Sequence, residues 1–254
     1  MVGVLADIGT LEWARRTNGI LGRGERARFV AAVALEQGRG LPRVLGARIG
    51  ILGGPGGPDP SKLAPPDSAV AREVIETVTE LDTSVVEHSY RCYLYARALA
   101  LAEGVECDTE AVFVAAMLHD HGTKEIPTLS DRCFTLVGAD EALATGERAG
   151  WDVARREAAA EAITLHLNPA VPADQGLVQH LVHDGVLLDV FGIRASELSS
   201  EGIDRVRERH PRLGFNRIGG GLFRENARRV PGCRAATLFA TGFGLALKLS
   251  PWQD

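Results

Sequence analysis

The sequence lacks the cysteine patterns of several protein classes. Its four cysteines, Cys92, Cys107, Cys133 and Cys233, are widely spaced and form no Cys-x-x-Cys pair. This spacing argues against a zinc ribbon and against a thioredoxin-type redox motif. A disulfide framework is also unexpected in a chain of 254 residues without an export signal. We therefore expect Cys92 and Cys107 to be small core residues.

Long apolar runs and basic blocks are absent as well. No run of 18 apolar residues occurs, so we expect no membrane-spanning helix. The first residues include Asp7 and Glu12 and lack a charged segment followed by a long apolar one, which argues against a signal peptide and favours the cytoplasm. The net charge of −5 gives no general attraction for nucleic acid. The expected partner is a small-molecule substrate.

What the sequence does contain is ordinary globular composition, with 45% hydrophobic and 24% charged residues. Apolar residues recur at helical spacing, and no convincing alternating run predicts a strand. The patterns therefore predict an all-α protein with one main domain. The predicted helices span residues 67–81, 84–103, 108–121, 139–149, 153–167, 175–191, 199–209, 221–229 and 235–248.

A Gly/Pro-rich segment divides the chain. Residues 53–66 contain four glycines and five prolines, which predicts a linker or an ordered surface loop. It separates an N-terminal arm, residues 1–52, from a helical core with a C-terminal extension, residues 67–254. Within the arm, residues 25–37 read as a helix ended by Gly38. We expect the arm to be an oligomerisation element, a lid or an extra packed helix. The first alternative would make the protein a homo-oligomer.

Four potential metal ligands lie in segments of helical pattern. His119 and Asp120 end the apolar run 111–118, and Gly122 follows at the expected stop. A buried carboxylate without a partner is unfavourable by several kcal/mol or takes up a proton. A cation next to Asp120 would remove that penalty.

The other two candidates lie on apolar helix faces. His88 points inward, either as a ligand or as a core histidine bonded to a carbonyl, and Asp189 shares a stripe with Val186. His180 and His183 lie on other faces of their helix, and we expect them at the surface. Two imidazoles and two carboxylates would suit Zn, Fe or Mn.

Three further residues are candidates for catalysis or binding. His166 ends the helix 153–166 on its apolar face. Its role is that of a fifth metal ligand, a general acid/base or a core residue, and the sequence leaves these three alternatives open. Thr123 and Lys124 follow the His-Asp pair and are candidates for contacting a polar or anionic substrate group. The alternative for Lys124 is that it is a solvated loop residue with no contact to the substrate.

The order His88, His119–Asp120, Asp189 resembles the HD-domain superfamily over roughly residues 65–230. The resemblance implies a helical bundle around a divalent metal, and an enzyme. The strings EHSYRCY, LHDHGT, FTLVGADEA, AITLH and LLDVFG resemble the cyanamide hydratase-like branch. Thr135 stands where that branch has Glu, which leaves the substrate open.

The predicted function is water addition by a metal-dependent hydratase or hydrolase. The resemblance implies a small polar substrate, such as the nitrile-like compound cyanamide, with metal-activated water adding to carbon and His166 passing a proton to nitrogen. One alternative is an HD-type phosphohydrolase, disfavoured because Thr123 replaces the acid that HD nucleotidases carry after the His-Asp pair. The other is a non-catalytic metal-binding ligand sensor.

Overall fold

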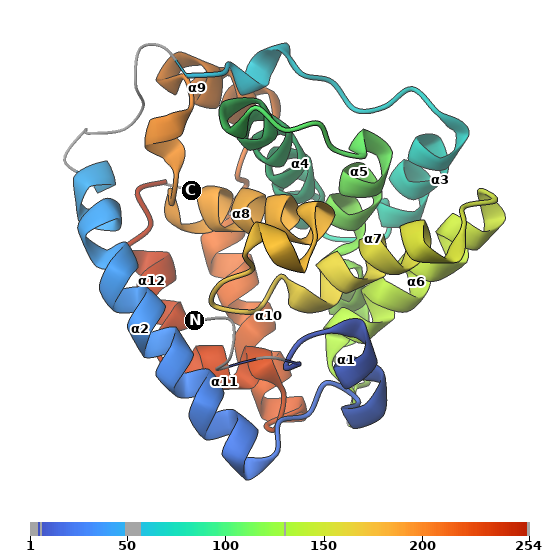
Figure 1. The fold of residues 1–254 in the computed structure, drawn as a ribbon. Coiled ribbons are helices and arrows are strands. Elements are labelled where there is room, and N and C mark those ends of the chain that lie inside the picture. Colours follow the sequence, from blue (N-terminus) through green and yellow to red (C-terminus); the bar gives the residue numbers. More distant parts are fainter. Residues whose placement is uncertain (1–4, 6, 49–56, 130, 253–254) are drawn as a thin grey trace.

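The described part of the chain is built from helices (Figure 1). A computed structural model describes residue 5 and residues 7–48, 57–129 and 131–252, excepting the side chains of residues 40–48. No strand occurs in these ranges, which confirms the predicted all-α fold class. The α-helices are α1 (Leu11–Thr17), α2 (Arg23–Arg48), α3 (Ala69–Val78), α4 (Thr83–Glu103), α5 (Thr109–Leu118), α6 (Phe134–Arg148), α7 (Val153–Leu165), α8 (Leu177–Phe191), α9 (Ser200–Arg209), α10 (Phe215–Arg229), α11 (Arg234–Ala240) and α12 (Phe243–Lys248). Short 3₁₀ helices are η1 (Pro60–Lys62), η2 (His121–Glu125), η3 (Ala173–Gln175) and η4 (Ala195–Glu197).

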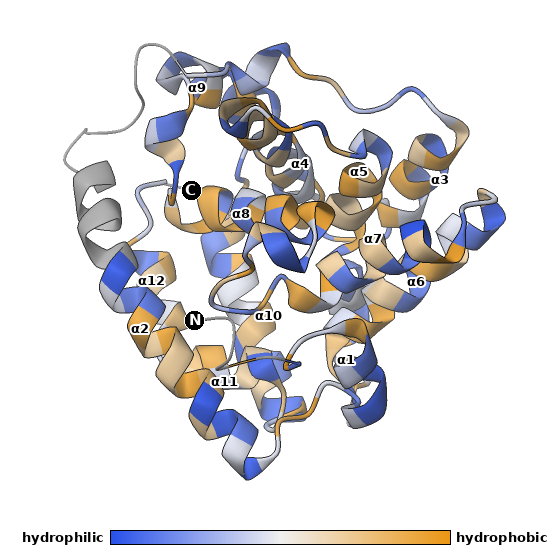
Figure 2. Ribbon diagram, in the orientation of Figure 1, coloured by the Kyte–Doolittle hydropathy of each residue, from blue (hydrophilic) through white to orange (hydrophobic). Residues whose placement is uncertain are grey.

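The centre of the bundle is α5, whose residues 111–118 are all buried. It packs between α4, α7 and α8, and Figure 2 shows apolar residues along the facing sides of these helices. Helix α8 can approach α4 closely because Gly185 has no side chain. A Cβ at that position would lie 2.4 Å from the carbonyl oxygen of Cys92. The residues at the ends of these central helices are thereby brought together. No helix in the described ranges is long and apolar enough to cross a membrane.

Several predicted helix boundaries are wrong. Helix α2 continues through Gly38, which is not among the glycines with positive φ. A glycine inside a helix lowers its stability by about 1 kcal/mol but does not by itself end it. The single helix predicted over 235–248 is two helices, α11 and α12, because Gly242 adopts a φ of 106° between them.

The N-terminal arm packs on the rest of the same chain. Helix α1 lies against α7 and α6, and α2 lies against α11 (Figure 1). Trp13 and Phe29 are both buried, and the Trp13 ring NH donates to Glu25 at 2.9 Å. Whether the arm also joins two copies of the chain stays a prediction.

The Gly/Pro-rich segment is described from residue 57 onward; residues 53–56 lie outside the described ranges. Its 3₁₀ helix η1 packs against α9 and α4. Asp59 accepts a hydrogen bond from Arg205 at 2.6 Å, and the Tyr93 hydroxyl donates to the Ala64 carbonyl at 3.1 Å. Residues 57–66 are thus tied to the helical core by side-chain contacts.

The turn between α1 and α2 holds the starts of two distant helices. Asn18 accepts the backbone N–H of Cys133 at 2.8 Å, and Leu21 donates to the Gly232 carbonyl at 2.9 Å. Gly19 lies between these contacts with a φ of 73°, and a Cβ there would lie 2.5 Å from the Cβ of Cys133. Both the backbone conformation and the close approach therefore require glycine at position 19.

We predict that Gly19→Ala lowers the free energy of unfolding by about 2 to 4 kcal/mol, the sum of left-handed strain and overpacking. The matched control is Gly104→Ala, because Gly104 has a similar φ of 67° with nothing within 4 Å of its Cβ position. In Gly104→Ala the free energy of unfolding should fall by only about 1 kcal/mol. Urea unfolding of both variants measures the difference, and equal losses would contradict a tight contact at Cys133.

Candidate metal centre

The first histidine of the site is held by a carboxylate from another helix. His88 lies in the buried part of α4, and Asp189 lies near the end of α8. The distance from His88 Nδ1 to Asp189 Oδ2 is 2.6 Å. Since the carboxylate can only accept, Nδ1 carries the proton and Nε2 is left with a free lone pair.

The other two histidines are fixed by the ends of their own helices. His119 follows α5 and His166 follows α7, each as the C-terminal cap residue. Each Nδ1 lies 2.7 Å from the carbonyl three residues earlier, that of Ala116 for His119 and of Ile163 for His166. The last carbonyls of a helix have no partner within the helix, so they accept these N–H groups. In both rings Nε2 is again the unprotonated nitrogen.

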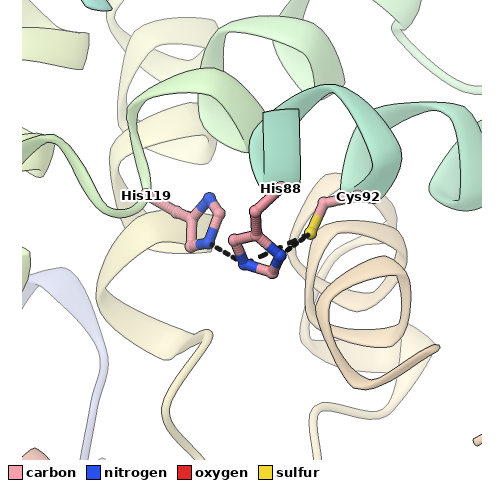
Figure 3. Close-up of side chains that lie close together, drawn as sticks. All are labelled: His88, Cys92 and His119. Carbon is pink, nitrogen blue, oxygen red and sulfur yellow. Dashed lines mark hydrogen bonds between the residues drawn. The ribbon is translucent and has the colours of Figure 1, made fainter. Parts of the chain in front are cut away.

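The three bare Nε2 atoms surround the carboxylate of Asp120. The Nε2 atoms of His88 and His119 face each other at 3.2 Å (Figure 3). Asp120 Oδ2 lies 3.4 Å from His119 Nε2 and 3.9 Å from His88 Nε2. Asp120 Oδ1 lies 4.0 Å from His166 Nε2. The chain thus brings three imidazoles and one carboxylate from α4, α5 and α7 to one place.

This donor set fits a divalent metal ion. Two facing nitrogens that are both acceptors repel each other unless a cation lies between them. Two nitrogens each about 2.1 Å from one ion at a tetrahedral angle are about 3.4 Å apart, close to the observed separation. Imidazole nitrogen with carboxylate oxygen suits Zn, Fe or Mn. His88, His119 and Asp120 are therefore the residues that would hold the ion, and His166 lies beside them.

Burial sets the protonation states that a metal requires. All four residues are buried, each with less than a tenth of its surface exposed. Burial lowers the pKa of His88 to about 4, against the opposing effect of Asp189, and lowers the pKa of His166 to about 3. Burial alone would raise the pKa of Asp120, but the three neighbouring imidazoles lower it. At neutral pH these two rings are neutral and Asp120 is ionised, as metal ligands must be.

Cys92 is a neighbour that the sequence analysis assigned only to the core. It lies one helical turn after His88, with Sγ 3.5 Å from both ring nitrogens of that residue. Together with His119 it forms a buried His-Cys-His group able to hold a metal (Figure 3). Burial raises the pKa of Cys92 well above its usual range, so the thiol is protonated in the absence of a metal. The i, i+4 spacing from His88 was the signal that could have identified it.

Asp189 lies on the opposite side of the His88 ring from the other ligands. Arg91 donates to both of its carboxylate oxygens, at 2.7 and 3.0 Å, and Arg212 lies 3.4 Å from Oδ2. Burial opposes ionisation, yet these arginines hold the pKa of Asp189 well below its usual range. In this structure Asp189 orients His88, an arrangement common around metal-binding histidines. Its role as a direct ligand stays a prediction.

The predicted substrate-binding residues do not contact the ligand side chains. Thr123 is buried in η2, and its hydroxyl donates to the Asp120 carbonyl at 2.6 Å. Lys124 forms an ion pair with Glu80 at 2.7 Å near the surface. Thr135 is buried in α6 and donates to Cys133 Sγ at 3.2 Å. A substrate contact by Thr123 or Lys124 stays a prediction.

His183 is buried, so the prediction that it lies at the surface is wrong. Its side chain is 2% exposed, with Nε2 2.9 Å from the Asn168 carbonyl and Nδ1 2.9 Å from Asp184. His180 is partly buried, with Nδ1 2.8 Å from the Val171 carbonyl. The loop after α7 covers this face of α8, which periodicity within α8 alone could not reveal.

Comparison with known proteins gives one family. Residues 85–204 match the family model of the HD domain. HD domains are all-α, bind divalent metals and are mostly metal-dependent hydrolases, so this match supports the HD-domain superfamily and, at that coarse level, an enzyme. The matched segment contains all four predicted ligands and His166 and ends before α10. No curated protein matches the chain.

We predict that the purified protein binds about one transition-metal ion and that Asp120→Ala and His119→Ala each lose it, because both remove a donor from the converging set. Elemental analysis of the purified variants measures this. The control is His183→Ala, which should keep the metal while losing about 1 to 3 kcal/mol of stability, since the hydrogen bond to the Asn168 carbonyl is lost. Full metal retention in both ligand variants would refute the site.

The low histidine pKa values predict a pH-dependent stability in metal-free protein. Between pH 6.5 and about 5 the unfolded chain takes up protons at His88 and His166, whereas the folded protein does not. Stability should therefore fall with decreasing pH, by up to about 1.4 kcal/mol per pH unit for each histidine. Urea unfolding after chelator treatment measures the slope. In His166→Gln the slope of the free energy of unfolding against pH should be smaller by the contribution of His166. An unchanged slope would contradict the pKa assigned to that residue.

Proposed function

We propose that the protein is a metal-dependent hydratase or hydrolase that adds water to a small, polar, uncharged substrate, such as a nitrile-like compound. The observation that carries this proposal is the convergence of three bare Nε2 atoms on the Asp120 carboxylate. His88, His119 and Asp120 would hold the metal ion, which leaves the Nε2 of His166 open for proton transfer. The HD-domain match to this segment supports hydrolytic chemistry.

His166 is the residue best placed to move a proton. When bound, a divalent ion would supply Lewis acidity and make a water molecule easier to deprotonate. The Nε2 of His166 is unprotonated because its Nδ1 is bonded to the Ile163 carbonyl, so it can accept the water proton. As the water oxygen bonds to carbon, His166 returns that proton to the substrate nitrogen. The short helix-end hydrogen bond keeps the ring oriented throughout.

The charges near the site favour an uncharged substrate over a phosphate ester. Arg91 and Arg212 are engaged with Asp189, and Lys124 is paired with Glu80. Among these groups a phosphate would find no unengaged cation other than the metal ion itself, which disfavours it. Phe215 and Phe134, whose rings lie 4.1 Å from His88 and 6.2 Å from His166 by ring centroids, add apolar surface. The phosphohydrolase alternative lacks these supporting features.

The experiment is a screen of the purified protein loaded separately with Zn, Fe or Mn. Cyanamide, other small nitriles and phosphomonoesters are supplied as substrates, and amide, urea or phosphate release is measured. We expect turnover of a nitrile-like compound that is absent in Asp120→Ala. Turnover of phosphomonoesters alone would replace the proposal with a phosphohydrolase. Metal binding without any turnover would favour a ligand sensor.

We predict that His166→Ala keeps the metal but slows turnover by about 10²- to 10⁴-fold, the range for loss of a general acid/base. Metal content, melting temperature and turnover are measured on this one variant. Loss of the metal would make His166 a ligand instead. Near-normal turnover per folded molecule, with a loss of about 1 to 3 kcal/mol in stability, would make it a core residue only.

A further inference from the structure

The metal centre is covered by a helix outside the segment that matches the HD domain. His88 and His119 are each 1% exposed, so protein closes over them. The ring of Phe215, at the start of α10, stacks on His88 with centroids 4.1 Å apart and planes 22° apart. Figure 1 shows α10 running beside the buried bundle toward α11. The cover therefore comes from the C-terminal extension.

A second phenylalanine of α10 lies against Phe134, the neighbour of His166. Phe223 contacts Phe134 at a ring-centroid distance of 6.1 Å, and Phe134 in turn faces His166 at 6.2 Å. The His119 ring lies between those of His88 and His166, about equally far from both, at 5.1 and 5.0 Å. Phe215 and Phe223 thus bound a stretch of α10 that has His88 against one end and Phe134, the neighbour of His166, against the other.

Gly219 lies midway along that stretch. Eight residues of an α-helix advance about 12 Å and turn about 80° beyond two full turns. Position 219, four residues from each phenylalanine, is therefore halfway between them in both height and direction. Gly219 is buried, as Phe215 is, so it lies on the side of α10 that faces the protein interior. A side chain at this position would lie next to Phe215, whose ring stacks on His88.

Space is available at this position. Gly219 is buried, yet a Cβ there would meet only the Phe215 ring as its nearest atoms, at 3.6 Å or more, an ordinary contact. The adjacent glycines differ. A Cβ on Gly220 would meet Leu247 at 3.5 Å, and one on Gly221 would meet nothing within 4 Å. Of these three glycines only Gly219 is buried, next to the Phe215 ring.

We infer that the substrate lies against the face of α10 between Phe215 and Phe223, and that Gly219, by having no side chain, sets the size of substrate that reaches the metal. This inference rests on the proposed function. It places substrate selection in the C-terminal extension, while the metal ligands belong to the HD-domain segment. The wall is apolar, which suits a small uncharged molecule.

The test compares two leucine substitutions on the same helix, Gly219→Leu and Gly221→Leu, in cobalt-loaded protein. Azide and imidazole are titrated as small and larger probes, and the visible absorption of the cobalt is recorded. We expect Gly219→Leu to weaken binding of both probes by at least about 10-fold, the effect of filling a pocket with extra methylenes. Gly221→Leu should leave the affinities unchanged, because its side chain points into open space.

A smaller substitution guards against loss of folding. In Gly219→Ala the added methyl fits without a clash. We expect this substitution to weaken the binding of imidazole more than the binding of azide. The same variants assayed with nitriles of increasing length should lose the longer substrates first. Melting temperature and cobalt content confirm that each variant is folded and loaded.

The possible failures are distinguishable. If the unsubstituted protein takes up neither cobalt nor zinc, iron or manganese, both the metal centre and the proposed function are wrong. If it binds cobalt and the probes, but Gly219→Leu and Gly219→Ala bind them as tightly, the inference about α10 is wrong while the proposed function stands. Cobalt-loaded protein that binds neither probe would also overturn it, because no reachable space would then lie beside the metal.

Discussion

The Nε2 atoms of His88 and His119, 3.2 Å apart and both unprotonated, repel each other unless a cation lies between them. Their protonation is set by the partners of Nδ1, the Asp189 carboxylate for one ring and the last carbonyls of α5 for the other. The ends of the central helices therefore determine the chemistry of the site. Asp120, the next residue after His119, supplies the negative charge that a divalent ion needs.

Much of the fold and part of the site could be predicted from the sequence because the signals are local. Asp108 caps the start of α5, and the apolar run that follows fixes that helix and places His119 and Asp120 at its end. The periodicity of α4 shows that His88 points inward. His166 was predicted at the end of α7 on a core-facing side, and it lies there, with Nε2 4.0 Å from Asp120.

The rest depended on contacts between distant segments. Nothing near Asp189 in the sequence indicates that Arg91, on another helix, binds both of its oxygens. Helix α6 begins at Phe134, five residues before its predicted start, because its cap is Cys133, a residue type that gives no capping signal. The burial of His183 likewise requires the loop after α7. Local patterns describe one helix at a time, whereas the site is made by several.

The turn between α1 and α2 has a consequence for how the chain is made. Leu21 is bonded to Gly232, 211 residues later in the chain, so the arm can dock fully only after that later segment has been made. Until then Trp13 and Phe29, both buried in the finished fold, have no complete binding surface. Large chains fold progressively during synthesis, and apolar surface left uncovered in this period promotes aggregation. Docking of the arm therefore depends on a segment far along the chain, which makes it a late step in folding.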